Sequence, residues 1–208
     1  NFCQPVNALS QSQWKAENNC SDFDLIIITL KSNATEGVLN EMAEWLKEGT
    51  CSILSLQNGV DNEIHIANTV GTQRTLGGLA VRIGGHTEQP GHIKAEGVAQ
   101  VIFGQWPNDH NASHLHALLS TFKNAQIDAS LSTDIRFDLW KKLIINNGVN
   151  PISALTGLDT KQITSDPVLR DNVHRMMQET AAAARCDDVI LTEDDVGEML
   201  DLISQFNA

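Results

Sequence analysis

The first third of the chain alternates short apolar runs with amphipathic segments, and this alternation limits the possible folds more than any other feature. Asp24–Leu30 and Cys51–Leu56 are continuous, largely apolar runs, typical of buried parallel strands. Ala34–Lys47 has apolar residues at helical spacing, and Asp61–Thr69 is also expected to be helical. Parallel strands joined by helices predict a Rossmann-like, doubly wound α/β sheet.

The pattern then changes twice. Three short runs separated by glycine and proline predict an antiparallel extension of the sheet: Thr75–Arg82, His92–Lys94 and Val98–Phe103. His114–Lys123 predicts a helix and Ile127–Leu131 a last strand, and from Thr133 onward the pattern is helical. We therefore expect residues 1–132 to form a Rossmann-like domain and residues 133–208 to form an all-helical domain.

Capping residues predict where the C-terminal helices begin. Thr133 or Asp134 would cap a long helix that ends at Gly148–Pro151. Ser165 would cap a second helix, and Thr192-Glu-Asp-Asp would open the last one.

Charge and cysteine usage exclude several kinds of partner. The net charge of −12 repels nucleic acid and anionic lipid, and no apolar run approaches the roughly 20 residues of a membrane span. The four cysteines are widely spaced, with no Cys-x-x-Cys pair, so we expect no metal site and a reducing, cytoplasmic environment.

The long predicted helix carries Lys142, Asn146 and Asn150 at four-residue steps, which places them on one face. One ammonium group and two amides can polarise and anchor a small, oxygen-rich substrate. Lys141 lies off this stripe. The alternatives are that Lys142 is a solvated surface charge and that Asn150 only ends the helix before Pro151.

Two further candidates follow neighbouring predicted strands. Lys31 comes directly after the first strand, and Asn58, in Gln57-Asn58-Gly59, follows the second. Ligands of such sheets bind beyond the carboxyl ends of the strands, so both side chains could line a site. A solvated loop lysine and an ordinary turn asparagine are the alternatives.

The chain has no Gly-x-Gly-x-x-Gly phosphate loop, and Gly77-Gly78 has the wrong spacing for one. Nevertheless, the two strand ends and the motif Ile135-Arg-x-x-Leu-Trp-x-Lys142-Leu-x-x-Asn146-x-x-x-Asn150-Pro-x-x-Ala154-Leu resemble the ketopantoate reductase (2-dehydropantoate 2-reductase) family over essentially the whole chain.

This resemblance implies an NADPH-dependent reduction of 2-dehydropantoate to pantoate, in pantothenate and coenzyme A synthesis. It implies that Lys142 is the general acid and that Asn146 and Asn150 bind the substrate. Asn207 matches, by its distance from Lys142, a further substrate-binding asparagine of the family. Lys31 and Asn58 would contact the nicotinamide-ribose side of NADP.

The family also implies a C-terminal domain of the 6-phosphogluconate dehydrogenase type, a small 2-keto acid as the partner and no metal, and leaves a homodimer open. Its first strand and glycine loop are absent from the chain, which stops at Ala208, so we expect a fragment. Two alternatives stand beside this interpretation. One is a reductase of another 2-keto acid, because the family's next asparagine is unmatched at Asp159-Thr160. The other is a non-catalytic Rossmann-like binding module.

Overall fold

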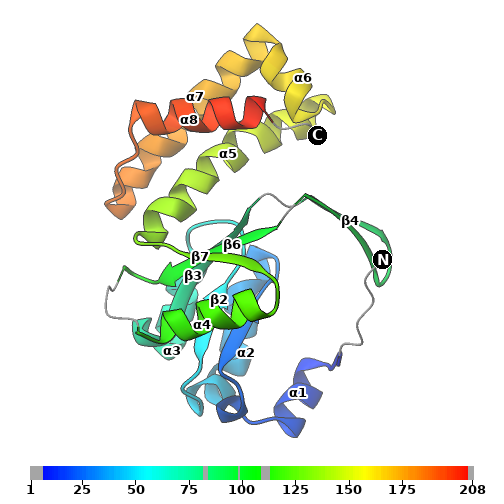
Figure 1. The fold of residues 1–208 in the computed structure, drawn as a ribbon, viewed down its shortest axis with the longest axis vertical. Helices are drawn as coiled ribbons and strands as arrows, with labels where there is room; N and C mark the ends of the chain where they lie inside the picture. The colour runs from blue at the N-terminus through cyan, green and yellow to red at the C-terminus, as the bar shows by residue number, and fades with distance from the viewer. Residues whose placement is uncertain (1–6, 82–83, 98, 109–112, 206–208) are drawn as a thin grey trace.

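The computed structural model describes residues 7–81, 84–97, 99–108 and 113–205. Figure 1 shows a sheet flanked by helices at one end of the molecule and a group of helices, α5 to α8, at the other. The predicted α/β sheet followed by a helical region is confirmed.

The main sheet has the strand order β1-β2-β3-β6-β7. Its strands are β1 (Leu25–Ile28), β2 (Ser52–Ser55), β3 (Thr75–Val81), β6 (Gln100–Gln105) and β7 (Asp128–Leu131). The first three are parallel, β6 is antiparallel to β3, and β7 is parallel to β6. The sheet is thus mainly parallel, with one antiparallel junction between β3 and β6.

Helices cover both faces of this sheet because successive residues of a strand point to opposite sides. Ile53 of β2 packs with residues of α2 (Ser32–Lys47) and α3 (Asn62–Val70). The next residue, Leu54, packs with α4 (Ser113–Asn124). A short helix, α1 (Gln11–Glu17), precedes the sheet (Figure 1).

Two strand predictions need correction. β1 was expected to be buried, but it lies at the edge of the described sheet, and Ile27 is 42% exposed. The run at His92 was expected to extend the sheet, but β5 (His92–Glu96) pairs only with β4 (Gly84–Gln89) in a separate hairpin. Ile93 of this hairpin is 74% exposed, so this large apolar side chain does not pack on the main sheet.

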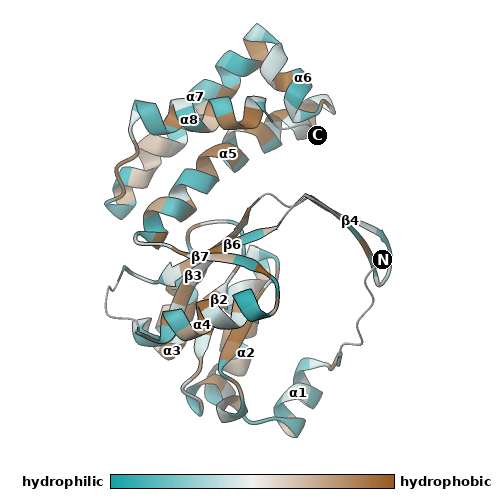
Figure 2. Cartoon of the chain, viewed as in Figure 1, coloured by the Kyte–Doolittle hydropathy of each residue, from teal (hydrophilic) through white to brown (hydrophobic). Residues whose placement is uncertain are grey.

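The C-terminal helices are α5 (Ile135–Thr156), α6 (Thr160–Ser165), α7 (Pro167–Ala184) and α8 (Glu193–Ser204). Hydrophobic and hydrophilic residues alternate along them (Figure 2), and the hydrophobic ones meet in a shared core around Ile144, Met177 and Ile203. Helix α5 also contacts β3 and β6, so the division into residues 1–132 and 133–208 stays a prediction. Among the described residues, none of the helices combines the length and apolar character needed to cross a membrane.

Capping residues define both ends of α5. Asp134 caps α5 and accepts a hydrogen bond from the Phe137 N–H at 3.0 Å. The predicted end at Gly148–Pro151 is wrong: α5 continues to Thr156 and stops at Gly157, whose φ is +71°. Pro151 removes one backbone donor, but the helix is continuous through it.

The second predicted cap is also wrong. Asp166, not Ser165, caps α7, and its carboxylate accepts from the Val168 and Leu169 N–H groups at 2.8 and 3.0 Å. Ser165 instead ends α6, a helix that the sequence analysis missed. The last helix opens where it was expected, and Thr192 caps it.

Glu63, at the start of α3, is fully buried. A Cβ on Gly77 would lie 3.4 Å from its Cγ, and its carboxylate oxygens have no hydrogen-bond partner among the described residues. Burial raises the pKa of this carboxyl group from 4.5 to about 7.

We predict that Glu63 makes the protein less stable as pH rises from about 4.5 to about 7. In this range the unfolded chain loses the Glu63 proton while the folded chain keeps it, so unfolding is favoured. Glu63→Gln should remove roughly 3 kcal/mol of that pH dependence. Urea unfolding of both proteins at pH 5 and pH 8 measures the difference. An unchanged difference between the two pH values in the variant would contradict this assignment.

Candidate functional site

A cavity of about 460 Å³ lies beyond the carboxyl ends of β1 and β2. It is lined by the loops that follow these strands, by β3 and by α5: Thr29, Leu30, Lys31, Ser32, Leu56, Gln57, Asn58, Ala80, Lys142 and Asn146. The fold therefore gathers Lys31, Asn58, Lys142 and Asn146, which are far apart in the sequence, around one space.

The two strand-end loops are tied together. The buried Gln57 amide donates hydrogen bonds to the Leu30 carbonyl at 2.8 Å and to the Thr35 hydroxyl at 2.7 Å. The Asn58 carbonyl accepts from the Ser32 hydroxyl at 2.7 Å and from the Asn62 amide at 3.1 Å. These bonds hold Lys31 and Asn58 at neighbouring positions on the cavity wall.

Sequence reasoning gave Gln57 no role beyond the turn and did not consider Ser32. The signal for Gln57 was its place between a buried strand and Asn58, where a long amide can bridge two loops. Asn58 occupies a bend, as the turn interpretation expected, and also lines the cavity.

Lys142 reaches the cavity from α5 because this helix packs closely on β3. A Cβ on Gly77 would lie 2.9 Å from Ile135 Cγ1 and 3.3 Å from Leu139 Cδ1, so only glycine permits the approach. Lys142 Nζ donates a hydrogen bond to the Ala80 carbonyl of β3 at 2.9 Å. Gly77, which does not belong to a phosphate-binding loop, therefore has a packing role that was not predicted from the sequence.

Burial governs the chemistry of Lys142. The side chain is partly enclosed, and burial lowers the pKa of its ammonium group because removal from water disfavours the charged form. A lysine with a lowered pKa releases its proton more readily than an exposed one, as a general acid requires.

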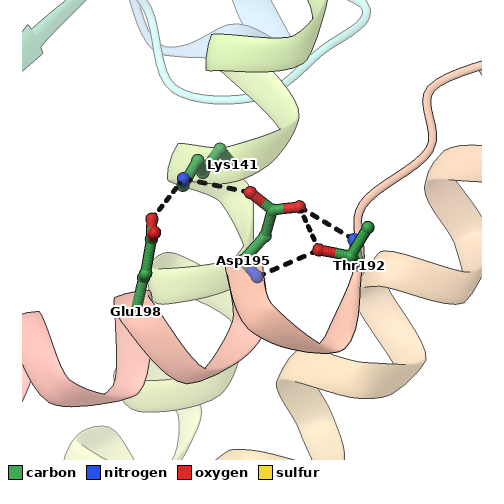
Figure 3. Close-up of polar contacts among 4 residues, drawn as sticks. All are labelled: Lys141, Thr192, Asp195 and Glu198. Atoms are coloured by element: carbon green, nitrogen blue, oxygen red, sulfur yellow. Dashed lines mark hydrogen bonds and ion pairs between the residues drawn. The ribbon is translucent and has the colours of Figure 1, made fainter.

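The neighbouring Lys141 points to a different part of the molecule. Its Nζ lies 3.1 Å from Asp195 Oδ1 and 2.8 Å from Glu198 Oε2, both on α8 (Figure 3). Asp195 also accepts a hydrogen bond from the Thr192 hydroxyl at 2.7 Å. Lys141 therefore links α8 to α5. The four-residue spacing correctly predicted that Lys141 and Lys142 lie on different faces of α5.

The cavity has a charge opposite to that of the chain. Lys31 and Lys142 contribute ammonium groups, and no carboxylate belongs to the described residues that line the cavity. The Asn146 side chain makes no hydrogen bond to the described residues, so its amide can bind a ligand. Although the net charge is −12, this space attracts a small anion that carries oxygen acceptors.

The other two predicted site residues are not gathered here. Asn150 lies one turn further along α5, is exposed and does not line the cavity. Asn207 falls outside the described residues. Within the described ranges, His, Cys, Asp and Glu side chains form no group of three or more that could hold a metal ion.

Two family models match the chain. Ketopantoate reductase PanE/ApbA matches residues 2–108, and Ketopantoate reductase PanE/ApbA C terminal matches residues 134–208.

Individual relatives agree with these matches. The chain is 30% identical to a 2-dehydropantoate 2-reductase of Pyrococcus abyssi over 161 residues, which are 77% of this chain and 52% of the relative. It is 32% identical to the enzyme of the same name from Pyrococcus horikoshii over 132 residues, 64% of this chain and 42% of the relative. The chain thus spans about half the length of the relatives it matches.

Solved structures share the fold. A 2-dehydropantoate 2-reductase from Geobacter metallireducens matches with a TM-score of 0.74 and 27% identity, over 87% of this chain and 60% of that one. A D-mandelate dehydrogenase in complex with NADH matches with a TM-score of 0.77 at 21% identity, over 87% of this chain and 59% of that one.

The adjacent lysines should affect stability differently. Lys141→Met should lower the free energy of unfolding by about 1–2 kcal/mol, because it leaves Asp195 and Glu198 without their cation. Lys142→Met should cost less or stabilise the protein, because it removes a buried charge that pairs with no carboxylate among the described residues. Urea denaturation of both variants measures this, and an equal cost for the two substitutions would refute the distinction.

Proposed function

This chain belongs to the ketopantoate reductase family, and we propose that its protein reduces 2-dehydropantoate to pantoate with NADPH, a step of pantothenate and coenzyme A synthesis. The observation that carries the proposal is the cavity at the strand ends, where Lys142 and Asn146 of α5 face Lys31 and Asn58. Such a cavity suits a small keto acid, which has one carboxylate and a polarisable carbonyl group.

The residues at the strand ends fit one part of a nicotinamide cofactor. Lys31 and Asn58 follow adjacent parallel strands, where dinucleotides bind in doubly wound sheets. They would hold the nicotinamide-ribose portion, and when bound, this cofactor supplies the hydride. The D-mandelate dehydrogenase structure contains NADH, so the assay below compares NADH with NADPH as the hydride donor.

Lys142 would act as the general acid. Negative charge develops on the carbonyl oxygen during reduction, and the Lys142 ammonium group stabilises this charge and donates the proton. The Ala80 carbonyl accepts a hydrogen bond from Nζ and fixes where the proton is offered. The burial that lowers the pKa of Lys142 makes the transfer easier.

Asn146 would orient the substrate. It lies one helical turn from Lys142 on the same face of α5, so its amide can hold a hydroxyl or carboxylate while the carbonyl faces Nζ. Lys31 adds a second positive charge for the substrate carboxylate or for the cofactor. The substrate-binding roles of Asn150 and Asn207, a homodimer and a cytoplasmic location stay predictions.

The alternative of another 2-keto acid rested partly on Asp159-Thr160. In the structure Asp159 caps α6, and its carboxylate accepts from the Gln162 N–H at 2.7 Å. This contact gives Asp159 a structural role, so the residue alone does not favour a different substrate.

The decisive variant is Lys142→Ala in the complete gene product, assayed by the loss of NADPH absorbance on addition of ketopantoate. We expect kcat to fall roughly 10²-fold or more, because general acid catalysis is lost. Lys141→Ala is the matched control: it removes the same charge one residue away, outside the cavity, and should keep near-normal kcat.

Each other outcome has a defined meaning. Unchanged turnover in Lys142→Ala would contradict the assigned acid. Oxidation of NADPH with a different 2-keto acid, but not with ketopantoate, would replace the substrate. Oxidation of NADH alone would replace the cofactor, and binding without turnover would favour the non-catalytic module.

A further inference from the structure

Two cysteines lie side by side at the end of the sheet opposite the cavity described above. Cys20 Sγ and Cys51 Sγ are 3.7 Å apart, and both residues are buried. Cys51 directly precedes β2, whereas Asn58 follows the same strand. The pair is therefore separate from Lys142, and its chemistry does not depend on the proposed function.

Arg74 contacts both sulfur atoms. Its Nη2 lies 3.9 Å from Cys20 Sγ and 3.8 Å from Cys51 Sγ. Two further hydrogen bonds fix the guanidinium group: Nε donates to the Cys51 carbonyl at 2.9 Å and Nη1 to the Leu46 carbonyl at 2.8 Å. Reactive cysteines typically lie in electropositive surroundings, and Arg74 places a cation in contact with both sulfur atoms.

The surroundings also keep the sulfurs close. A Cβ on Gly49 would lie 2.4 Å from Cys20 Sγ, so glycine makes room for this thiol. A disulfide needs a sulfur separation of about 2.05 Å, so the two sulfur atoms must approach each other from their present 3.7 Å for the bond to form.

The two cysteines differ in access. Cys51 is 6% exposed and lines a cavity of about 430 Å³ together with Thr50, Ser52 and His114, whereas Cys20 is completely enclosed. Burial is the largest influence on Cys20 and raises the pKa of its thiol. A small oxidant can therefore reach the Cys51 sulfur from this cavity, whereas the Cys20 sulfur is shielded from solvent.

We propose that Cys20 and Cys51 form a peroxide-oxidisable dithiol site in which Cys51 reacts first and Cys20 resolves the product as a disulfide. The Cys51 thiolate attacks one oxygen of hydrogen peroxide and the O–O bond breaks. Cys51 becomes a sulfenic acid, and the departing hydroxide takes up a proton to form water. Cys20 sulfur then attacks Cys51 sulfur, the S–O bond breaks, and a second water leaves with the Cys20 proton. The thiols lose two electrons, and the peroxide gains them.

The test is a peptide map of the complete gene product after brief treatment with hydrogen peroxide. The protein is quenched, denatured, alkylated with N-ethylmaleimide and digested with trypsin, without a reductant. We expect tryptic peptide 16–31, which contains Cys20, to be joined to peptide 48–74, which contains Cys51, with the loss of two hydrogen atoms. Cys186 is exposed and serves as the internal reference for an ordinary thiol.

Two conservative variants test the order of events. In Cys20→Ser, dimedone should trap a sulfenic acid on Cys51, because no thiol remains to resolve it. In Cys51→Ser, Cys20 should stay reduced at the same peroxide dose. The proposal is overturned if both thiols of the wild-type protein are recovered alkylated when Cys186 is already oxidised. Dimedone labelling of Cys20 in Cys51→Ser would overturn the proposed order.

Discussion

The close packing of α5 on β3 is the contact on which the candidate site depends. Gly77 has no side chain, so Ile135 and Leu139 can rest directly on the strand, and the helix then directs Lys142 to the Ala80 carbonyl. A larger residue at position 77 would collide with Ile135 and Leu139 of α5 and force this contact to change. Glu63 lies beside the same contact, because a Cβ on Gly77 would be 3.4 Å from its Cγ. The packing of α5 on β3 therefore determines where Lys142 lies in the cavity.

Two opposing electrostatic effects meet at Lys142. Removal from water disfavours its charge, whereas a developing negative charge on a bound substrate would favour it. The carboxylates of Asp195 and Glu198 on α8 pair with Lys141 and not with Lys142. Within the described part of the chain, the Lys142 ammonium group has one hydrogen-bond acceptor, the Ala80 carbonyl, and its charge remains available to an anionic ligand.

The sequence predicted those features that depend on periodicity. The alternating runs located β1 and β2, and the four-residue step in α5 separated Lys142 from Lys141. The exact ends of helices were harder to predict, because adjacent residues can each serve as a cap or a stop. Asp166 and Ser165 are both good caps, and only the preceding helix α6 decides between them. A proline usually ends a helix, but core packing on both sides of Pro151 keeps α5 continuous.

The site shows the same division. Lys31 and Asn58 could be placed at strand ends from the pattern alone, but the bridge through Gln57 depends on how two loops meet in space.

The most direct test of Lys142 as the general acid is the pH dependence of kcat/KM for keto acid reduction by the complete gene product. The account predicts that kcat/KM falls at high pH with an apparent pKa below the ordinary lysine value of 10.5, because only the protonated amine is active. A profile that stays flat to pH 10.5 and beyond would contradict it.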